Sequence, residues 1–341
     1  MRIFQWSATG ILLILLSSSL ASAQQTPLQV SINGSTVDSY DATSKDILGE
    51  AIKQHNDSKK SSGTSISTFS MGRLRETNHD GYKSSFRDKS LPFTSSEYSL
   101  FGALGYNFNK PNGRLSVHAF AGITEIDMDL KASPELGFNT KPGSAQNEAV
   151  MAGTTIVYSS GAMYGGFKGS YFAGKTDVND IANNRRPSYD TEGFILSGMM
   201  GRVSELNKNT FLTTEIGTRY IHFNNDGYAS NSRNFNVVHD LYTLTGWSSL
   251  KLIKVYNMNG WTVRPYGAMQ VSFDFRYDHS EVVEGAGEDP ATAEREPVQG
   301  RLELGASTSK GNWDISGAGF FDVAEDHEAY GGRVGVSYKL K

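Results

Sequence analysis

The chain contains no cysteine, and only nine of its 341 residues are proline. Without disulfides, an exported protein of this size must be held together by core burial or by closed backbone hydrogen bonding. Beyond the N-terminus no run approaches about 18 apolar residues, which excludes a transmembrane helix there. The sequence also lacks a glycine-rich phosphate loop, a Cys/His metal cluster and a nucleophile elbow, so we expect no cofactor.

The N-terminus has the features of a secretory signal peptide over residues 1–23. Arg2 supplies a positive charge, Gly10 to Leu20 form a short apolar stretch, and Ala21-Ser22-Ala23 is a small-residue cleavage site. The apolar stretch is roughly half the length that a membrane-spanning helix needs. We therefore expect export from the cytoplasm and a mature chain that begins near Gln24.

The composition of the mature chain narrows its class. Loss of Arg2 leaves 31 basic and 36 acidic residues, a net charge of −5, which argues against a nucleic-acid-binding protein. The chain is rich in glycine (36), tyrosine (16) and phenylalanine (18). Glycine tolerates curved strands, while tyrosine and phenylalanine favour strands and tyrosine also suits membrane interfaces.

Residues 24–63 form a polar N-terminal segment with one predicted helix at 44–55. Thr43 and Asp46 have the spacing of a capping box, which would begin the helix there. Four apolar residues then share one helical face: Ile47, Leu48, Ala51 and Ile52. The segment is too short for a large exported domain, so we interpret it as a vestigial passenger or a plug.

From residue 64 to residue 341 the apolar pattern changes to a period of two, which predicts strands. In the ninth strand, Trp261 and Phe273 share one face and Arg264 and Asp274 share the other. In the third strand the apolar face changes near Thr124, and either a β-bulge or a strand leaving the bilayer would explain this. The predicted strands are 65–76, 97–108, 113–129, 148–158, 162–177, 191–205, 209–223, 240–256, 260–278, 297–309, 312–323 and 329–340.

The connections between these strands alternate between short and long. Turns such as 110–112 and 310–311 alternate with long polar segments such as 77–96 and 279–296. Short periplasmic turns and long external loops are the signature of bacterial membrane barrels. Charged residues in mid-strand would cost several kcal/mol each in a dry core unless paired, whereas a wet lumen accepts them. We therefore predict an all-β protein, a closed antiparallel transmembrane β-barrel of about twelve strands in the outer membrane of a Gram-negative bacterium.

The charged face of the predicted strands supplies candidates for a lumen lining. Two roles are open for them: cross-strand ion pairs that brace the barrel against a plug, which we favour, or a charged pore that selects solutes. The helix at 44–55 can fill the bore or rest on a periplasmic partner. The lumen-lining candidates are Glu97, Arg114, Lys168, Arg202, Glu215, Arg219, Arg264, Asp274, Arg276, Arg301, Glu303 and Arg333.

Three segments resemble recurring patterns of the autotransporter β-domain family. Gly260 to Gly267 resembles its Gly-x-x-x-x-Pro-Tyr segment, Arg301 to Gly305 its Arg-x-x-x-Gly strand, and Phe211 to Tyr228 its middle hairpin. The resemblance covers roughly residues 64–341. It implies a twelve-stranded translocator barrel preceded by a helix that threads the lumen, and insertion by the barrel-assembly machinery.

Two departures from the family pattern affect the functional prediction. The chain ends in Lys341 where the family has an aromatic residue, and only about 40 residues separate Gln24 from the barrel. The resemblance implies a structural or secretion role with surface-exposed loops, whereas the short segment before the barrel leaves little or no passenger. A porin-like passive channel for small solutes is the alternative. The partners expected are outer-membrane lipid, lipopolysaccharide and the assembly machinery, with no nucleic acid, and the barrel is expected to be a monomer.

A surface hydrolase is the least favoured function. Ser116 and His118 fall on the lumen face of one strand without an asparagine partner, and acyl transfer needs a base in contact with the nucleophile. His222 lies at a strand end, and the pairs His239-Asp240 and Asp278-His279 lie near loop ends. The acidic loop Asp278, Glu281, Glu284, Glu288 and Asp289 matches no defined calcium loop. We therefore predict no enzyme, no catalytic residue and no metal site.

Overall fold

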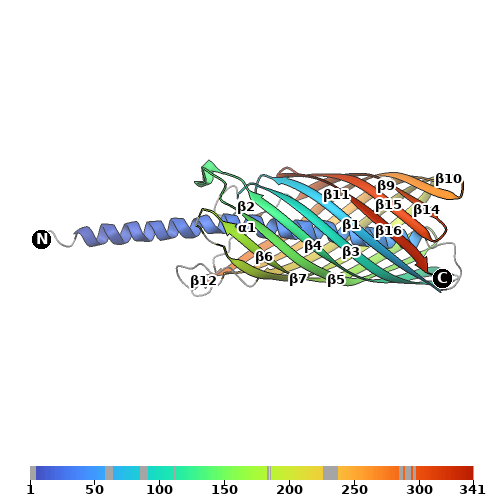
Figure 1. Cartoon of the computed structure of the whole chain (residues 1–341), viewed down its shortest axis with the longest axis horizontal. Helices are drawn as coiled ribbons and strands as arrows, with labels where there is room; N and C mark the ends of the chain where they lie inside the picture. The colour runs from blue at the N-terminus through green and yellow to red at the C-terminus, as the bar shows by residue number, and fades with distance from the viewer. Residues whose placement is uncertain are drawn as a thin grey trace.

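The computed structural model consists of one long helix followed by a closed barrel (Figure 1). Helix α1 spans Gln5–Asp57, and its side chains are described from Gln29 onward. No helix in the described part of the chain is long and apolar enough to cross a membrane. The structure describes residues 5–57, 64–84, 91–110, 112–182, 184, 186–225, 237–283, 287–288, 293–294 and 297–340.

Twelve long antiparallel strands form the barrel in the described part of the chain. Each pairs with the preceding and following long strand, and β1 pairs with β16 to close the ring. The long strands are β1 (Thr64–His79), β3 (Phe93–Lys110), β4 (Gly113–Leu130), β5 (Gly143–Ser160), β6 (Met163–Asp180), β7 (Ser188–Asn207), β8 (Thr210–Asn225), β9 (Val237–Lys254), β11 (Trp261–Val283), β14 (Val298–Lys310), β15 (Trp313–Val323) and β16 (His327–Leu340). Short strands are β2 (Lys83–Ser84), β10 (Tyr256–Met258), β12 (Gly287–Glu288) and β13 (Ala293–Glu294).

The predicted closed barrel is confirmed, and most strands are longer than predicted at the end that carries the long loops. The fourth predicted strand, 148–158, is observed as Gly143–Ser160. The pairing of β4 with both neighbours continues without a register shift through Thr124, so no bulge is present there. Ile126 and Met128 are buried inside the barrel, where they pack on other buried residues. The change of apolar face therefore marks the point at which β4 leaves the bilayer.

A bulge is present instead in β11, and it corrects two predicted orientations. Asp274 pairs with Thr245 and Arg276 with the next residue of β9, so Phe275 is an extra residue in β11. The extra residue reverses the parity of the strand. Arg276 therefore faces outward with its side chain 70% exposed, while Tyr277 packs inward on the buried apolar clusters. Continued alternation from Phe273 and Asp274, as the sequence analysis assumed, would place Arg276 in the lumen with Asp274 and Tyr277 on the lipid face with Phe273.

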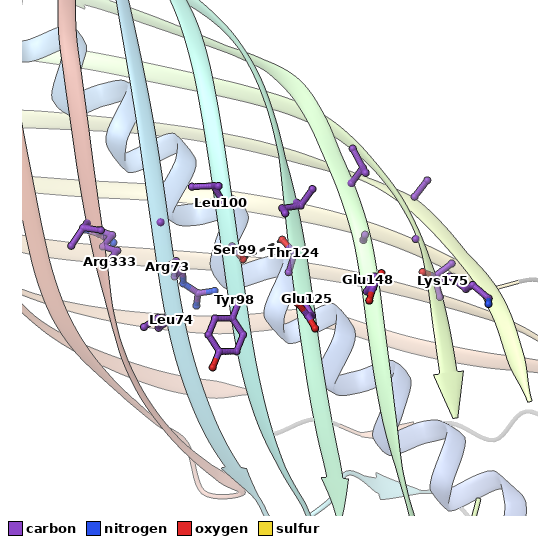
Figure 2. A pocket seen from close by; sticks show the side chains of 18 of the residues that line it. Arg73, Leu74, Tyr98, Ser99, Leu100, Thr124, Glu125, Glu148, Lys175 and Arg333 are labelled. Atoms are coloured by element: carbon purple, nitrogen blue, oxygen red, sulfur yellow. Dashed lines mark hydrogen bonds between the residues drawn. The ribbon is translucent and has the colours of Figure 1, made fainter. Parts of the chain in front are cut away.

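The outer wall changes from apolar to charged side chains towards the long loops, from Leu100 to Glu125, Glu148 and Lys175 (Figure 2). Leu100, Ile123 and Val150 lie opposite one another on β3, β4 and β5, and all three are exposed on the outside. Two residues further towards the long loops, Glu125 lies opposite Glu148, which lies opposite Lys175 on β6. Because charged groups on the lipid face are costly near the membrane centre and cheap at the interface, the outer boundary of the bilayer lies between these two rows. Along β3, β4 and β5, apolar residues that face outward alternate with residues that face the lumen, as expected for a barrel wall with lipid on its outer side only.

The opposite end of the barrel carries tight turns, such as the one that joins β10 to β11. Asn259 (φ 49°) and Gly260 (φ 80°) both have left-handed backbone conformations, which two-residue hairpin turns require. Figure 1 places the C-terminus at this end, while the N-terminal part of α1 projects from the other. β1 begins and β16 ends at this turn end of the barrel, as an even number of strands requires.

Helix α1 is much longer than the helix predicted at 44–55. The predicted capping box is wrong, because the helix continues through Thr43 and Asp46 towards the N-terminus. The Thr43 hydroxyl instead donates to Glu97 Oε1 at 2.7 Å, and Asp46 binds arginines of the barrel wall. Local sequence rules assign Thr43 and Asp46 to a helix start, but in the folded protein both side chains bind residues of the barrel wall instead.

Candidate functional site in the filled lumen

The lumen of the barrel is occupied by the C-terminal half of α1. Most described side chains of α1 are buried, and the helix contacts β1, β3, β4, β5, β6 and β8. It runs from the long-loop end to the turn end, where β1 begins (Figure 1). A helix with so little amphipathic character gains its stability from packing on all sides rather than from one apolar stripe.

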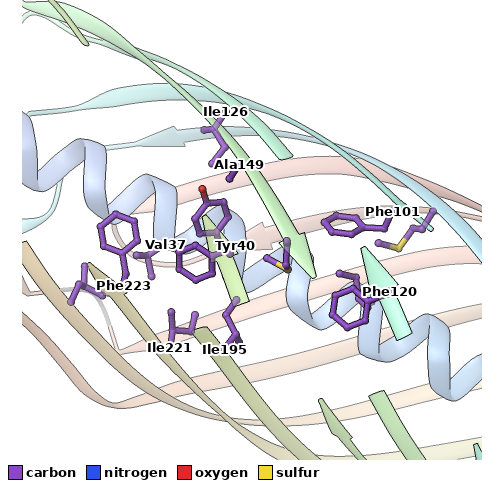
Figure 3. Packing of buried hydrophobic residues seen from close by; sticks show 14 of the residues in the cluster. Val37, Tyr40, Phe101, Phe120, Ile126, Ala149, Ile195, Ile221 and Phe223 are labelled. Atoms are coloured by element: carbon purple, nitrogen blue, oxygen red, sulfur yellow. The ribbon is translucent and has the colours of Figure 1, made fainter. Parts of the chain in front are cut away.

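An apolar cluster holds the middle of the helix (Figure 3). Val37, Tyr40 and Ile47 of α1 are fully buried, and the rings of Tyr40 and Phe172 lie 4.4 Å apart. Lumen-facing partners come from strands around the barrel: Phe69, Met71, Phe101, Phe120, Ile126, Ala149, Met151, Phe172, Ile195, Ile221, Phe223 and Leu241. A second cluster near the turn end joins Leu48, Ala51 and Ile52 to Val157, Tyr164 and Met199. These contacts make the interior a packed core rather than an open bore.

At the long-loop end, where α1 leaves the barrel, aromatic residues pack around the helix. Tyr82 lies directly against Gly34 of α1, where a Cβ atom would overlap the tyrosine ring, and its hydroxyl donates to Asp38 Oδ2 at 2.8 Å. Val30 and Ile32 of the helix pack in the same cluster. We call this group the mouth cluster; its other described members are Leu91, Phe93, Met128, Leu130, Phe138, Ala145, Val178 and Tyr189.

Asp46 lies at the centre of an ionic network, which we call the latch. Its carboxylate forms ion pairs with Arg73, whose Nε lies 2.8 Å away, with Arg333, and with Arg301, whose Nη1 lies 3.5 Å away. These arginines come from β1, β16 and β14, and the Asp46 side chain is only 1% exposed. One helical carboxylate therefore ties α1 to β1 and β16, which pair with each other at the seam, and to β14, which is separated from β16 by β15.

Each arginine of the latch also has a carboxylate on the barrel wall. Arg73 pairs with Glu97, Arg333 Nη2 donates to Glu303 Oε1 at 2.7 Å, and Arg301 Nη2 donates to Asp322 Oδ2 at 2.7 Å. Arg75 Nε lies 3.7 Å from the same Asp322. Four arginines thus face four carboxylates, which is the balance that buried charges need because an unpaired buried charge is costly.

Further polar contacts hold the helix along its length. Asp41 pairs with Arg219 of β8, and Lys53 pairs with Asp314 of β15. Tyr40 donates to Asn147 Oδ1 of β5 at 2.5 Å. Near the turn end, His55 Nδ1 lies 2.6 Å from Ser116 Oγ and its Nε2 lies 2.8 Å from Ser159 Oγ. The helix is therefore fixed in depth and rotation by contacts to opposite sides of the wall.

The helix does not fill the lumen evenly. A cavity of about 200 Å³ remains beside it, against β8, β9, β11 and β14. Among the lining residues are seven basic side chains and three acidic ones: Lys45, Lys53, Arg219, Lys251, Arg264, Arg301, Arg333, Asp46, Glu215 and Glu303. Basic side chains therefore outnumber acidic ones in this lining, although several of them are paired with carboxylates next to the cavity: Arg219 with Asp41, Lys53 with Asp314 and Arg301 with Asp322.

Ten of the twelve predicted lumen residues lie on the inward face, and two do not. Arg276 is turned outward by the bulge in β11. Arg202 is exposed and shares its face with Met200, which is 56% exposed on the outer wall. Because side chains alternate along a strand, Arg202 must point outward as Met200 does. Arg202 lies at the turn end of β7, where a long basic side chain can reach the lipid headgroups. The inward residues are Glu97, Arg114, Lys168, Glu215, Arg219, Arg264, Asp274, Arg301, Glu303 and Arg333.

The sequence analysis placed two arginines of the latch, Arg301 and Arg333, in the lumen but missed Asp46 and Arg73. Asp46 was assigned to a helix cap, and Arg73 and Arg75, which lie in the predicted strand 65–76, were not among the lumen-lining candidates. The signal was present: the odd-numbered residues of β1 from Phe69 to Arg75 all face inward. It was obscured because a plugged lumen accepts large apolar residues beside charged ones on the same face.

The histidines considered for catalysis are placed in other roles. The Ser116 hydroxyl donates to Asn107 Oδ1 at 2.5 Å, so its proton is not directed at a histidine base. His118 is fully buried, with its ring 6.1 Å from that of Phe69. His222 lies at the rim, 3.5 Å from Asp240 and stacked on Tyr242. The side chains of His239, His279 and the loop acids from Glu281 to Asp289 lie outside the described residues.

Comparisons with known proteins agree with this architecture. The autotransporter β-domain model matches residues 76–319. The translocator domain of the autotransporter NalP from Neisseria meningitidis is 16% identical with a TM-score of 0.61, covering 88% of this chain and 97% of that one. The β-domain of the Bordetella autotransporter BrkA is 15% identical with a TM-score of 0.61, covering 81% and 100%.

The transport unit of AIDA-I from Escherichia coli is 10% identical with a TM-score of 0.59, covering 82% of this chain and 91% of that one. No curated protein matches the chain. At these identities the solved structures support the fold alone. The family match covers most of the chain, and translocator barrels of this family are in general not enzymes. The chain belongs to the autotransporter β-domain family and is an outer-membrane β-barrel.

Proposed function

We propose that this protein is a translocator-type barrel whose lumen is closed by its own helix, with little or no passenger. In this proposal it has a structural or secretion role at the cell surface, where its loops are exposed, and it catalyses no reaction. The observation that carries the proposal is the latch, in which Asp46 binds Arg73, Arg301 and Arg333 from three strands. A pore meant to stay open would not need a buried, charge-balanced attachment for a helix in its bore.

Surface display of the helix N-terminus tests this topology. An epitope inserted between Ala23 and Gln24 should bind antibody on intact cells, because α1 leaves the barrel at the long-loop end. N-terminal sequencing of the purified protein should find the epitope at the start of the chain, since we infer that residues 1–23 are removed. Detection only after permeabilisation of the outer membrane would contradict the proposal. An epitope in the turn at Asn259-Gly260 is the matched control and should be hidden on intact cells.

A passive channel for small solutes is the second candidate, because a cavity of about 200 Å³, lined by more basic than acidic side chains, remains beside the helix. Planar-bilayer conductance separates the two functions. We expect residues 24–341 to be silent and residues 64–341, without the helix, to conduct. A steady conductance of the longer chain, with preference for anions, would support the channel and oppose the plugged barrel.

Two partners follow from the position in the membrane. We infer that the barrel-assembly machinery inserts the chain and that lipopolysaccharide covers its outer wall. A hollow of about 1350 Å³ on that wall combines apolar residues such as Leu100 and Val150 with charged residues such as Glu148 and Lys175 (Figure 2). Acyl chains would lie on the apolar part, and lipid phosphates would lie at Lys175. Co-purification of lipopolysaccharide that is reduced by Lys175→Glu would support this partner.

A further inference from the structure

Two histidines and an aspartate meet where the first and last strands of the barrel reach the long-loop end. His79 of β1 lies directly opposite His327 of β16, and their rings stack with centroids 5.3 Å apart and planes 12° apart. Asp326 precedes β16; its Oδ1 lies 2.8 Å from His327 Nδ1 and its Oδ2 lies 3.7 Å from His79 Nε2. One ligand atom from each residue lies within 4.8 Å of the other two.

The spacing of these atoms suits a transition-metal ion. In a tetrahedral zinc site with bonds of about 2.1 Å, neighbouring ligand atoms lie about 3.4 Å apart. The two Asp326–histidine distances fall on either side of that value. Imidazole nitrogens favour zinc, copper and nickel over calcium and magnesium, and a carboxylate completes a three-residue set with one position left for water.

The three side chains are held in place by their surroundings. His79 is 1% exposed, and its ring stacks on Phe93 and lies 4.3 Å from that of Tyr82. The main chain of Asp326 accepts from Asp80 N at 2.8 Å, which fixes the turn against the end of β1. Such support lowers the cost of arranging ligands around an ion, because little side-chain freedom is lost on binding.

We propose that His79, Asp326 and His327 form a binding site for a divalent transition-metal ion of the zinc class. The Gly81 N–H donates to His79 Nδ1 at 2.9 Å, which directs Nε2 towards Asp326. Metal binding at Nε2 moves the imidazole proton to Nδ1 and releases the Gly81 contact. The ion joins β1 to β16 at the seam, and through Tyr82, which donates to Asp38 of α1, it also stiffens the mouth cluster over the plug.

Zinc titration of the folded protein tests the proposal. The mature chain without a polyhistidine tag is folded in detergent, freed of metal with EDTA, dialysed, and titrated with Zn²⁺ in a calorimeter. We expect one saturable site per chain, no such site in His79→Ala or His327→Ala, and at least tenfold weaker binding in Asp326→Asn. The last variant is nearly isosteric, so it keeps the test valid if the alanine variants fail to fold.

A matched control is available at the opposite part of the rim. His222 lies 3.5 Å from Asp240, a similar pair without a third ligand among the described residues, and His222→Ala should bind zinc as the unaltered protein does. The proposal is overturned if the unaltered chain shows no saturable zinc binding, or if Asp326→Asn, His79→Ala and His327→Ala all keep the affinity of the unaltered chain. Folding of each variant is checked by heat-dependent gel migration. Because the zinc titration does not measure conductance, a negative result would leave the proposal of a plugged barrel intact.

Discussion

Asp46→Asn should release the plug without unfolding the barrel. The substitution keeps the shape of the side chain but removes the charge that Arg73, Arg301 and Arg333 share. Breaking a buried ion pair by removing one partner costs about 3–5 kcal/mol. The low end applies here, because each arginine keeps a second carboxylate: Glu97, Asp322 and Glu303 respectively.

A cost of about 3 kcal/mol raises the population with an undocked helix roughly a hundredfold. Single-channel recording in planar bilayers measures this directly, as more frequent openings of the Asp46→Asn barrel than of the unaltered chain. Asp129→Asn is the control, because Asp129 pairs with Lys141 on the surface, with side chains 65% and 46% exposed, and such pairs contribute little. If the Asp46→Asn barrel opens no more often than the Asp129→Asn control, although its helix has not been cleaved off, the latch does not hold the plug.

Two further substitutions and one deletion test other parts of the structure. Leu304→Arg, at a lipid-facing side chain that is 74% exposed in the middle of β14, should lower the free energy of unfolding in lipid vesicles by about 2–4 kcal/mol, whereas Leu304→Met should change it little. Gly34→Leu should displace the Tyr82 ring and make the mouth protease-sensitive, while Gly49→Ala, where a Cβ meets nothing within 4 Å, should not. Deletion of Phe275 removes the bulge but keeps the β9–β11 pairing on both sides, so the barrel should still show heat-dependent gel migration; loss of that migration would show that the bulge is needed for closure.

The barrel could be predicted from the sequence because lipid imposes a simple pattern. Leu100, Ile123 and Val150 must alternate with inward residues, and the length of each connection reports which end it lies on. The extra strand length at the long-loop end was missed for the same reason. Beyond Glu125 and Glu148 the outer face meets water, so the lipid-driven pattern ends although the strand continues.

The lumen site was only partly predictable, because the residues on the inward face are determined by their contacts with α1 and not by exposure to water. Arg73 and Met71 share that face, since one meets the latch and the other an apolar part of α1. A one-residue bulge at Phe275 also leaves no mark in a sequence of alternating residues, which is why Arg276 was assigned to the wrong side. Helix residues such as Asp46 gain their roles only from strands that lie far away in the chain.

A disulfide between helix and wall tests most directly whether α1 occupies the lumen. Thr43 Oγ1 and Ser99 Oγ lie 3.4 Å apart, and the chain has no cysteine of its own, so Thr43→Cys with Ser99→Cys should form a cross-link in the assembled outer-membrane protein. Thr43→Cys with Leu100→Cys, the next residue but on the outer face, should not. Non-reducing gels should show a mobility shift for the first pair only. Free thiols in the first pair, both labelled by a water-soluble maleimide, would show that the helix does not lie where the structure places it.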